Sequence, residues 1–495
     1  MSKILSDKNK TLNSLWLLLL TAGALLVQGY HPFAEDAEIY LPGVERILHP
    51  ELFPVEREFF LAHASMTWFP NVIAFSLRVT HLPMEAGLFI WHVASIFLLL
   101  LGCWELSRLF FPSARARWCG VALVAALLST PVAGTALYIM DQYLNPRNLA
   151  AFAGIFMLAR TLEKKYVRAL LWVAFAACMH PLMWVFPTSF CLLFVVMEKL
   201  GNRWKWLNPA GLASLVWVGI PLAPAATAAY HEAAKRHGYH YIQNWAWYEL
   251  LGIVAPLILF WCFGRVARGR GWRVLERVSR AFVFYGAIYL VGAVLVDLPA
   301  RLEALARIQP LRSLHFLYIV MFIIIGGFLG EFVLRDRVWR WLALFLPLCA
   351  GMFLAQRTLF PASAQVEWPG MAPRNPWSQA FIWIRQNTAV DAVFALDPYY
   401  MDIADEDEIG FRCLAERSRL ADGVKDNGVV SMFPPLAEEW WAQVQDQTPW
   451  KDFRSSDFER LKDKYGVGWV VVQSGEGAGL NCIYQNDAVR VCRIP

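Results

Sequence analysis

The sequence contains few charged residues for its length. Asp, Glu, Lys and Arg make up 17% of its 495 residues, whereas hydrophobic residues make up 57%. Soluble domains carry about 25% charged residues, so this chain has too little charge to cover an ordinary soluble surface. Apolar runs long enough to cross a bilayer recur along the chain, and they predict an integral membrane protein with several spans.

The sequence also lacks the short motifs of several large enzyme classes. It contains no P-loop, no dinucleotide-binding glycine pattern, no GxSxG and no HExxH. These absences argue against an ATP-driven pump and against a serine or zinc hydrolase. No CxxC or Cys/His spacing suggests a zinc site, and six of the nine cysteines lie in or beside apolar runs, where they behave as small hydrophobic residues.

Charge is unevenly distributed along the chain. The net charge is +5, yet residues 374–495 carry 13 basic and 19 acidic residues. The basic excess therefore lies in the loops that flank the apolar runs, where membrane topology accounts for it. We expect no nucleic-acid partner.

The apolar runs predict about eleven transmembrane helices. Pro181 and Pro187 fall in the pair of runs around 166–198, which is compatible with a tight hairpin or with a broken helix. The predicted spans are residues 13–30, 84–107, 118–139, 146–162, 166–180, 183–198, 208–229, 249–264, 281–297, 314–331 and 338–356.

Lysine and arginine residues fall on alternate loops of this count. The clearest case is the loop 264–280, with six Arg against one Glu. Because cytoplasmic loops carry an excess of Lys and Arg, the N-terminus is predicted to be cytoplasmic and the C-terminus external. The external segments are then 31–83, 140–145, 230–248, 298–313 and 357–495.

Three parts follow from this topology. Residues 1–356 are predicted to form a transmembrane domain, whose first external loop, 31–83, contains amphipathic helices that lie on the membrane surface. Residues 357–373 are rich in Pro and Ala and are interpreted as a linker. Residues 374–495 are predicted to form a small α/β domain outside the cytoplasm. The fold class is thus a multispan α-helical membrane protein with a C-terminal extracytoplasmic α/β domain.

Periodicity predicts individual elements in this last part. A helix is expected over 375–388, a strand over 392–396, and a helix, a glycine stop and a buried strand over 455–473. Residues 481–494 alternate around Asn486-Asp487, which predicts a hairpin. Cys482 and Cys492 lie near each other on such a hairpin and are compatible with a disulfide, although the simplest register pairs residue 482 with residue 491.

Two adjacent carboxylates, Glu35 and Asp36 in "GYHPFAEDAEIY", follow the first predicted span. A carboxylate at a membrane exit can act as a general base or bind a metal ion, and burial would raise its pKa. Adjacent residues on a helix point about 100° apart, so both seldom serve one site if the segment is helical. An ordinary solvated acidic loop is the alternative.

The external loop "MDQYLNPRN" contains Asp141 and Arg147 at the start of a predicted helix. A guanidinium at a helix N-terminus suits a phosphate group. Alternatively, Arg147 extends its charge to the membrane interface. His180 in "MHPLM" lies near the external end of a span, where an ionisable residue indicates either a functional site or a packed histidine.

Two further external segments carry cations. His237 lies in "YHEAAKRHGYHYIQNWAWYE" (230–249), whose cationic and aromatic side chains suit a phosphate with a sugar or prenyl chain, or an interfacial aromatic belt. Arg307 and Arg312 lie in the external segment 297–316, against the usual charge bias. Binding of an anionic lipid phosphate would explain them, and so would simple tolerance.

Taken together, these motifs resemble the GT-C superfamily of membrane glycosyltransferases. The segments "EDAEIYLPGVERILHPELFP", "YLNPRN", "MHPLM" and "W…IRQNT…DAVFALDP" look like a set of bacterial multispan proteins of GT-C type. The resemblance implies a polyprenyl-phosphate-linked sugar donor, a glycan, lipid or protein acceptor, inversion at the sugar, and a location in the bacterial cytoplasmic (inner) membrane.

The resemblance also implies residue roles. Asp36 or Glu35 would be the catalytic base or would bind a divalent metal ion such as Mg²⁺ or Mn²⁺, and Glu38 is a further candidate. Phosphate or substrate contacts would come from the other external candidates: Arg147, His180, Arg312, His237, Asp141 and Arg307. In oligosaccharyltransferases of this superfamily, a Trp-Trp-Asp motif lies in the soluble domain, whereas "EEWWAQ" (438–443) lacks the Asp. A protein N-glycosylating enzyme is therefore not expected.

Two rival interpretations use the same residues. A glycolipid transporter or flippase-like protein would bind the lipid phosphate without chemistry, although such proteins usually contain inverted repeats that are not evident here. A non-catalytic scaffold of an envelope polysaccharide complex would tolerate substitution of the carboxylates.

Overall fold

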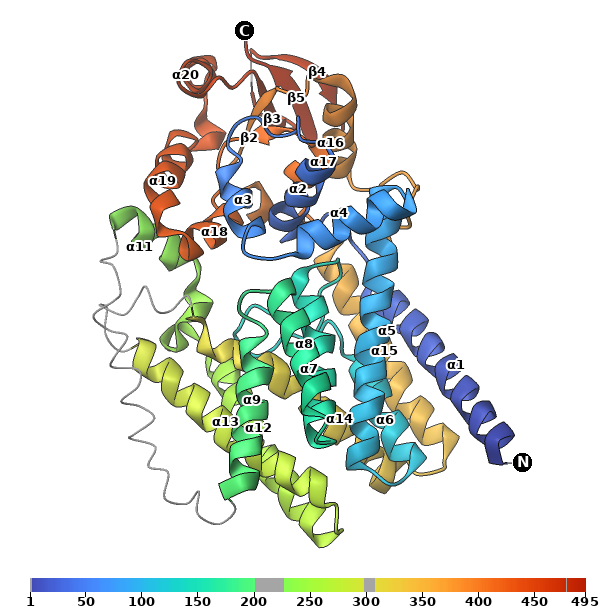
Figure 1. Cartoon of the computed structure of the whole chain (residues 1–495). Coiled ribbons are helices and arrows are strands. Elements are labelled where there is room, and N and C mark those ends of the chain that lie inside the picture. The colour runs from blue at the N-terminus through green and yellow to red at the C-terminus, as the bar shows by residue number, and fades with distance from the viewer. Residues whose placement is uncertain (1, 201–226, 298–307, 478) are drawn as a thin grey trace.

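The computed structural model describes residues 2–200, 227–297, 308–477 and 479–495. A bundle of long helices forms one end of the molecule, and a small sheet with its own helices forms the other (Figure 1). The helices of the bundle are α1 (Ser2–Gln28), α5 (Met84–Phe110), α6 (Ala114–Ala126), α7 (Pro146–Leu162), α8 (Tyr166–Met179), α9 (Val185–Leu200), α12 (Trp247–Gly269), α13 (Arg273–Asp297), α14 (Ser313–Phe328) and α15 (Val338–Leu359).

Six helical segments of the described chain are long and apolar enough to cross a membrane: Thr11–Gln28, Met84–Phe110, Trp247–Gly269, Arg273–Leu295, Pro310–Leu334 and Val338–Leu359. Each coincides with a predicted span. Helices α7, α8 and α9 coincide with three more, but they have 17, 14 and 16 residues, below the roughly 20 that a membrane span needs. Most of the predicted span 208–229 lies outside the described residues, so the count of about eleven stays a prediction.

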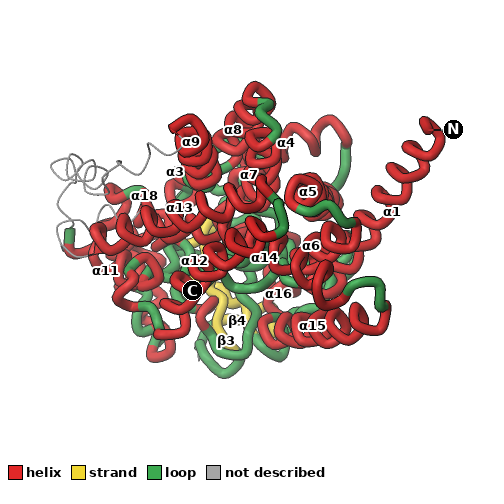
Figure 2. The backbone as a smooth tube through the Cα atoms, turned by 90° about the horizontal axis from the view of Figure 1, so that it is seen from below, coloured by secondary structure: helices red, strands yellow, loops and turns green. Residues whose placement is uncertain are grey.

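Helix α14 is the buried centre of the bundle. It packs against α6, α12 and α13, and side chains such as Leu317, Ile319 and Ile323 are fully buried. Seen from below, α1 and α15 lie at the periphery (Figure 2). Exposed apolar side chains such as Leu18 and Leu346 cover these two helices, as expected of surfaces that face lipid.

The predicted span 118–139 is wrong in its second half. Helix α6 ends at Ala126, and residues 127–145 form irregular backbone with an isolated bridge between Pro131 and Tyr138. Pro131 lacks the backbone N–H that a helix needs, and Gly134 weakens helix formation further. This irregular segment is important below because it lies beside the candidate site.

The first predicted external loop is mostly helical. It forms α2 (Ala37–Leu48), α3 (Glu58–Ala64) and α4 (Phe69–Thr80), which lie between the bundle and the C-terminal sheet (Figure 1). Trp68, Phe75 and Val79 are exposed around α4, which agrees with a helix lying on a membrane surface.

The C-terminal part has a mixed five-stranded sheet in the order β2-β1-β3-β5-β4. Strands β1 (Val393–Leu396) and β2 (Ser418–Arg419) are parallel, as are β1 and β3 (Trp469–Gln473), whereas β4 (Asn481–Gln485) and β5 (Val489–Arg493) form an antiparallel hairpin beside β3. The helices are α16 (Pro376–Asn387), α17 (Arg412–Ala415), α18 (Asp426–Met432), α19 (Ala437–Asp446) and α20 (Ser455–Tyr465), and α11 (Ala228–Arg236) packs against α18 and α19.

The hairpin contains a disulfide between Cys482 and Cys492. The simplest register expected from the sequence, residue 482 opposite residue 491, is wrong. A β-bulge between Cys482 and Tyr484 shifts the pairing, so that Tyr484 lies opposite Val491 and Cys482 opposite Cys492.

Candidate functional site

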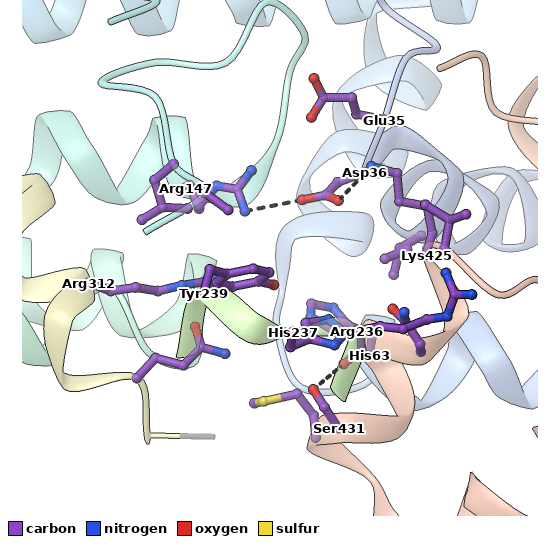
Figure 3. A pocket seen from close by; sticks show the side chains of 18 of the residues that line it. Glu35, Asp36, His63, Arg147, Arg236, His237, Tyr239, Arg312, Lys425 and Ser431 are labelled. Atoms are coloured by element: carbon purple, nitrogen blue, oxygen red, sulfur yellow. Dashed lines mark hydrogen bonds and ion pairs between the residues drawn. The ribbon is translucent and has the colours of Figure 1, made fainter. Parts of the chain in front are cut away.

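A cavity of about 570 Å³ lies where the bundle, the first-loop helices and the C-terminal part meet. This volume is in the range of about 300–1,000 Å³ that is usual for small-molecule sites. Of the residues predicted from the sequence, it brings together Glu35, Asp36, Arg147, His237 and Arg312 (Figure 3). His180 lines the same cavity. Side chains far apart in the chain thus face one space.

The backbone of the acidic segment before α2 is held in place by hydrogen bonds to the backbone of the C-terminal part. Ala34 forms an isolated bridge with Ile409, and the Glu35 N–H donates to the Glu408 carbonyl at 2.7 Å. Glu35 has a φ of +51°, a left-handed conformation that is uncommon for residues other than glycine. Asp36 then precedes the first residue of α2. The two carboxylates therefore stand on different backbone conformations and have different partners.

Asp36 is paired with cations from two directions. Its Oδ2 lies 3.1 Å from Arg147 Nη1, and its Oδ1 lies 3.8 Å from Lys425 Nζ. Figure 3 shows the Asp36 carboxylate directed at the Arg147 guanidinium. An ion pair from the bundle and one from the C-terminal part thus meet at a single carboxylate.

The start of α7 positions Arg147. Asn145 caps this helix by accepting from the Asn148 N–H at 3.1 Å, and Pro146 fits the first helical position. Arg147 donates from Nη2 and Nε to the two oxygens of Asp141, at 3.1 and 3.3 Å. Asp141 is buried behind the arginine and does not line the cavity, so it orients Arg147 and is not itself placed to contact a substrate.

The pKa values of the two neighbouring carboxyl groups are shifted in opposite directions. Burial acts to raise the pKa of Asp36, but Arg147, Lys425 and Arg312 outweigh it and hold this pKa below its ordinary value. For Glu35, burial dominates; Lys425 opposes it, and Glu408 and Asp36 reinforce it, which raises the pKa to about 8. At neutral pH the Asp36 side chain is therefore ionised, whereas Glu35 is mostly protonated.

Arg312 is a cation that no carboxylate neutralises within the described residues. It ends the short helix η6 (Pro310–Arg312), lines the cavity, and its buried Nε has no hydrogen-bond partner. No Asp or Glu oxygen of the described chain lies within 4.0 Å of its guanidinium. A partly buried guanidinium that has no carboxylate partner among the described residues favours binding of an anion. Arg307, the other predicted arginine of this segment, lies outside the described residues.

The two histidines present different ring nitrogens. His180 Nδ1 accepts from the N–H groups of Leu182 and Met183, at 3.1 and 3.2 Å, so neutral His180 carries its proton on Nε2 and is a donor there. His237 Nδ1 lies 3.2 Å from the Ala233 carbonyl, so it is protonated on that nitrogen, and its Nε2 is an acceptor. Burial lowers the pKa of His237 to about 4 and keeps this ring neutral.

Three residues that line the cavity were not predicted from the sequence as site residues: Lys425, His63 and Arg236. Lys425 is a lone lysine in an acidic segment, and no sequence motif marks it as a site residue. Its Nζ nevertheless lies in the cavity, 2.9 Å from Glu408. Arg236 lies 3.5 Å from Asp402 and 3.9 Å from the centre of the Tyr399 ring. His63 comes from α3 and lines the same cavity.

A buried ion-pair network fixes the turn that carries Lys425. Arg412 donates to both oxygens of Asp426, at 2.9 and 2.8 Å, and its backbone N–H donates to Glu38 at 2.6 Å. Glu38 is a further catalytic candidate from the sequence. It is fully buried, pairs with Arg412 and does not line the cavity. It connects α2, which begins beside Asp36, to the C-terminal part.

The residues around Asp36 do not fit a divalent metal ion. Within the ranges that the structure describes, no group of three His, Cys, Asp or Glu side chains is arranged to hold one. Both Asp36 oxygens face cationic side chains, Arg147 and Lys425, which would repel Mg²⁺ or Mn²⁺. We therefore assign no step to a metal.

The solved structures that resemble this chain include two archaeal oligosaccharyltransferase structures. One is the oligosaccharyltransferase of Archaeoglobus fulgidus in the apo form, with 11% identity, a TM-score of 0.48, and coverage of 92% of this chain and 69% of that one. The other is the archaeal oligosaccharyltransferase AglB from the same organism in complex with an inhibitory peptide and a dolichol-phosphate, with 11% identity, a TM-score of 0.44, and coverage of 94% and 70%. No protein-family model and no curated protein matches the sequence.

Proposed function

We propose that this chain is a membrane glycosyltransferase that uses a polyprenyl-phosphate-linked sugar donor. The observation that carries the proposal is the pairing of an ionised carboxylate, Asp36, with Arg147 in a cavity that Arg312 also lines, and no carboxylate of the described residues neutralises Arg312. Transfer of a sugar from a lipid phosphate needs both a base for the acceptor hydroxyl and a cationic site for the phosphate that leaves.

In the proposed reaction, Asp36 takes the proton of the acceptor hydroxyl. The hydroxyl oxygen forms a bond to the anomeric carbon, and the bond from that carbon to the phosphate oxygen breaks, with its electron pair remaining on the phosphate. Attack from the face opposite the phosphate inverts the sugar. Arg312 and the His180 Nε2–H are the donors we assign to the phosphate, and neutral His237 is the acceptor we assign to a sugar or acceptor hydroxyl.

The ion pair between Arg147 and Asp36 couples these events. Protonation of Asp36 removes the negative charge that Arg147 faces at 3.1 Å. The guanidinium is then more strongly attracted to the charge that develops on the phosphate. Proton transfer and departure of the phosphate thus assist each other without a metal ion, and activity in the presence of a chelator tests this.

The finer assignments belong to the same proposal. The donor would be a polyprenyl-phosphate sugar, the acceptor an envelope glycan, lipid or protein, and the membrane the bacterial cytoplasmic membrane, with the cavity on its external side. The N-terminus would lie in the cytoplasm. Lys425, Glu408 and the turn before α18 line the cavity from the C-terminal part, so this part would contribute directly to the site.

The test is transfer by the purified full chain in lipid nanodiscs. A mixture of radiolabelled polyprenyl-phosphate sugars supplies the donor, and release of the label from the lipid is measured in the presence of envelope extract. We expect release by the wild-type chain and by Asp405→Asn, an exposed control on a nearby loop, and loss of release in Asp36→Asn. Full release by Asp36→Asn would contradict the proposal. Movement of intact lipid across the bilayer without bond cleavage would favour the transporter alternative.

A further inference from the structure

A second cavity, of about 370 Å³, lies where the linker after α15 meets the start of α5 and the C-terminal part. It shares no lining residue with the cavity that Asp36 lines. Trp368 and Met371 line it and are exposed, so it is open at the surface of the molecule. Helix α5 can cross a membrane, and Glu85 of its first turn lines the cavity. The cavity therefore lies at the level of a membrane surface, where tryptophan is a common residue.

Two side chains of this cavity, Tyr30 and Gln365, carry polar atoms that the fold leaves without a partner. Tyr30 is fully buried, and its hydroxyl has no hydrogen-bond partner within the described residues. Gln365 donates from Nε2 to the Val27 carbonyl at 3.0 Å, which fixes the orientation of the amide. Its buried Oε1 accepts no hydrogen bond from the described chain. Such orphaned atoms are rare in folded proteins, so two at one cavity point to a polar ligand.

Two carboxylates line the same cavity. Glu367 Oε2 lies 3.2 Å from Nδ1 of His31, and Glu85 Oε2 accepts from the Gly370 N–H at 3.1 Å. Among the described residues, no Lys or Arg nitrogen lies within 4.0 Å of either carboxylate. Burial raises the pKa of Tyr30 above its ordinary value, and the charges of Glu367 and Glu85 add to this shift. Both carboxylates therefore act on the Tyr30 hydroxyl.

The polar atoms of this cavity match a cation that donates hydrogen bonds. The two orphaned oxygens and the two carboxylates all accept hydrogen bonds. A primary ammonium has three N–H donors and one positive charge, so it can satisfy both oxygens and one carboxylate together. Trp368 and Phe33 give the cavity an aromatic wall, which also attracts a cation. Within the described ranges, no three His, Cys, Asp or Glu side chains are arranged to hold a metal ion.

The cavity is also lined by a cation of the chain itself. Arg374 is exposed, and no Asp or Glu oxygen of the described residues lies within 4.0 Å of its guanidinium. A guanidinium without a carboxylate partner suits a phosphate group. The same cavity thus offers acceptors for an ammonium and a donor for an anion, which is the pattern that a zwitterion needs.

We infer that this cavity is a second binding site, for a phosphoethanolamine group. The ammonium donates to Tyr30, Gln365 and a carboxylate, and the phosphate meets Arg374. Phosphatidylethanolamine carries this group as a lipid, and glycerophosphoethanolamine carries it in solution. The position at the level of a membrane surface favours the lipid. The inference goes beyond the proposed function, because it involves none of the residues to which that function assigns a role.

Native mass spectrometry of the full chain in detergent tests the inference with two dihexanoyl lipids. Phosphatidylethanolamine and phosphatidylcholine share the phosphate and the positive charge, but the trimethylammonium of the second has no N–H donor. We expect phosphatidylethanolamine to have a dissociation constant about tenfold lower, because hydrogen bonds from a charged donor are lost in the other lipid. Glycerophosphoethanolamine identifies the source: weaker binding than the lipid indicates a lipid ligand, and equal binding a soluble one. Both results agree with the inferred head-group chemistry.

Tyr30→Phe separates a binding role from a structural one. It removes a hydroxyl that has no partner among the described residues, so the melting temperature without added lipid should not fall. Binding of phosphatidylethanolamine should nevertheless weaken by about fivefold, the effect of one hydrogen bond.

Three substitutions of charged residues complete the set. Glu85→Gln removes a charge at the ammonium and should weaken binding of phosphatidylethanolamine by about tenfold. Arg374→Gln should weaken binding of both lipids by the same factor, because they share the phosphate. Glu438→Gln makes the same change as Glu85→Gln on an exposed residue of α19 and should leave both dissociation constants unchanged.

Three outcomes would overturn the inference. Equal binding of the two lipids by the wild-type chain would show that the N–H donors do not matter. Unchanged binding by both Tyr30→Phe and Glu85→Gln would place the lipid elsewhere. A lower melting temperature of Tyr30→Phe with unchanged binding would make the hydroxyl structural. None of these results bears on the proposed glycosyl transfer, which the release of label tests separately.

Discussion

The Arg147 guanidinium lies 3.1 Å from the Asp36 carboxylate, across the interface between the helix bundle and the first-loop helices. This contact decides which of the two adjacent acids is ionised. Arg147, with Lys425 and Arg312, lowers the pKa of Asp36, whereas Glu35 lacks such an arginine contact and is protonated at neutral pH. A general base must be unprotonated to act, so the structure favours Asp36 over Glu35 for this role.

Substitution of the two acids should therefore have unequal effects. Asp36→Asn removes the base and should lower the rate of transfer by about 10²–10⁴-fold, the usual contribution of a general base. Glu35→Gln imitates the protonated form that Glu35 already has at pH 7, so the rate there should change by less than about threefold. Initial rates of label release by the two variants check this prediction. An inactive Glu35→Gln beside an active Asp36→Asn would reverse the assignment.

Lys425 should affect the pH dependence of transfer. Asp36 must be ionised, so activity should be lost as the pH falls through its pKa. Lys425 is among the cations that lower this pKa, and its removal in Lys425→Met should raise it and shift the acidic limb of the pH–rate profile to higher pH. The other charged groups that act on Asp36 and its neighbour Glu35 stay in place: Arg147, Arg312, Glu408 and Asp141.

Two controls accompany the Lys425 experiment. Lys425→Arg keeps the positive charge and should restore the acidic limb. Lys451→Met removes a lysine that is exposed and lies away from the cavity, so it should leave the profile unchanged. If Lys425→Met lowered the rate equally at every pH, its role would be in folding or binding and not in the ionisation of Asp36.

Asp141 should act through Arg147. Asp141→Asn keeps the size of the side chain but weakens the two-point contact that holds the guanidinium, at 3.1 and 3.3 Å. Misplacement of a catalytic group by about 1 Å can cost about 10²-fold, so kcat should fall by up to this factor. Arg147→Lys should resemble Asp141→Asn because an ammonium cannot make the same forked contact. Steady-state kinetics of both variants test this, and an unchanged kcat in Asp141→Asn would contradict it.

The buried network of Arg412 should matter for stability. Arg412→Met leaves Asp426 without its cation and leaves Glu38 with only the longer contact to Arg419, at 3.9 Å, in a fully buried position. Breaking such a pair typically costs about 3–5 kcal/mol, so the melting temperature of the purified chain should fall clearly. Arg460→Met, which removes a half-exposed pair with Asp446, should cost no more than about 1 kcal/mol. Similar melting temperatures for the two variants would show that the buried network contributes little.

The sequence by itself determined much of the helical framework. Long apolar runs predicted the six helical segments that can cross a membrane, and α7 occupies the predicted residues 146–162. In the C-terminal part, α16, β1 and the β4–β5 hairpin lie close to their predicted positions. These features depend on local hydrophobicity, helix caps and turn residues, which are properties of neighbouring residues in the chain.

Sequence patterns did not predict the end of α6 or the register of the β4–β5 hairpin, because single-residue irregularities decide both. Helix α6 ends at Ala126, and Pro131 and Gly134 disfavour helix in the rest of a run that is apolar enough for a span. The bulge between Cys482 and Tyr484 shifts the hairpin register by one residue and thereby permits the disulfide. Overall hydrophobicity and alternation do not record such single-residue irregularities.

The candidate site was visible in the sequence as separate residues and became a cavity only through tertiary structure. Glu35, Asp36, Arg147, His180, His237 and Arg312 are unusual in their local context, and each could be named from its segment. Lys425 could not, because a lysine in an acidic segment looks like an ordinary solvated side chain. The tertiary structure places it 3.8 Å from Asp36, through the contact of Glu38 with Arg412. Which carboxylate is ionised depends on such distances, because Coulomb interactions act through space and not along the chain.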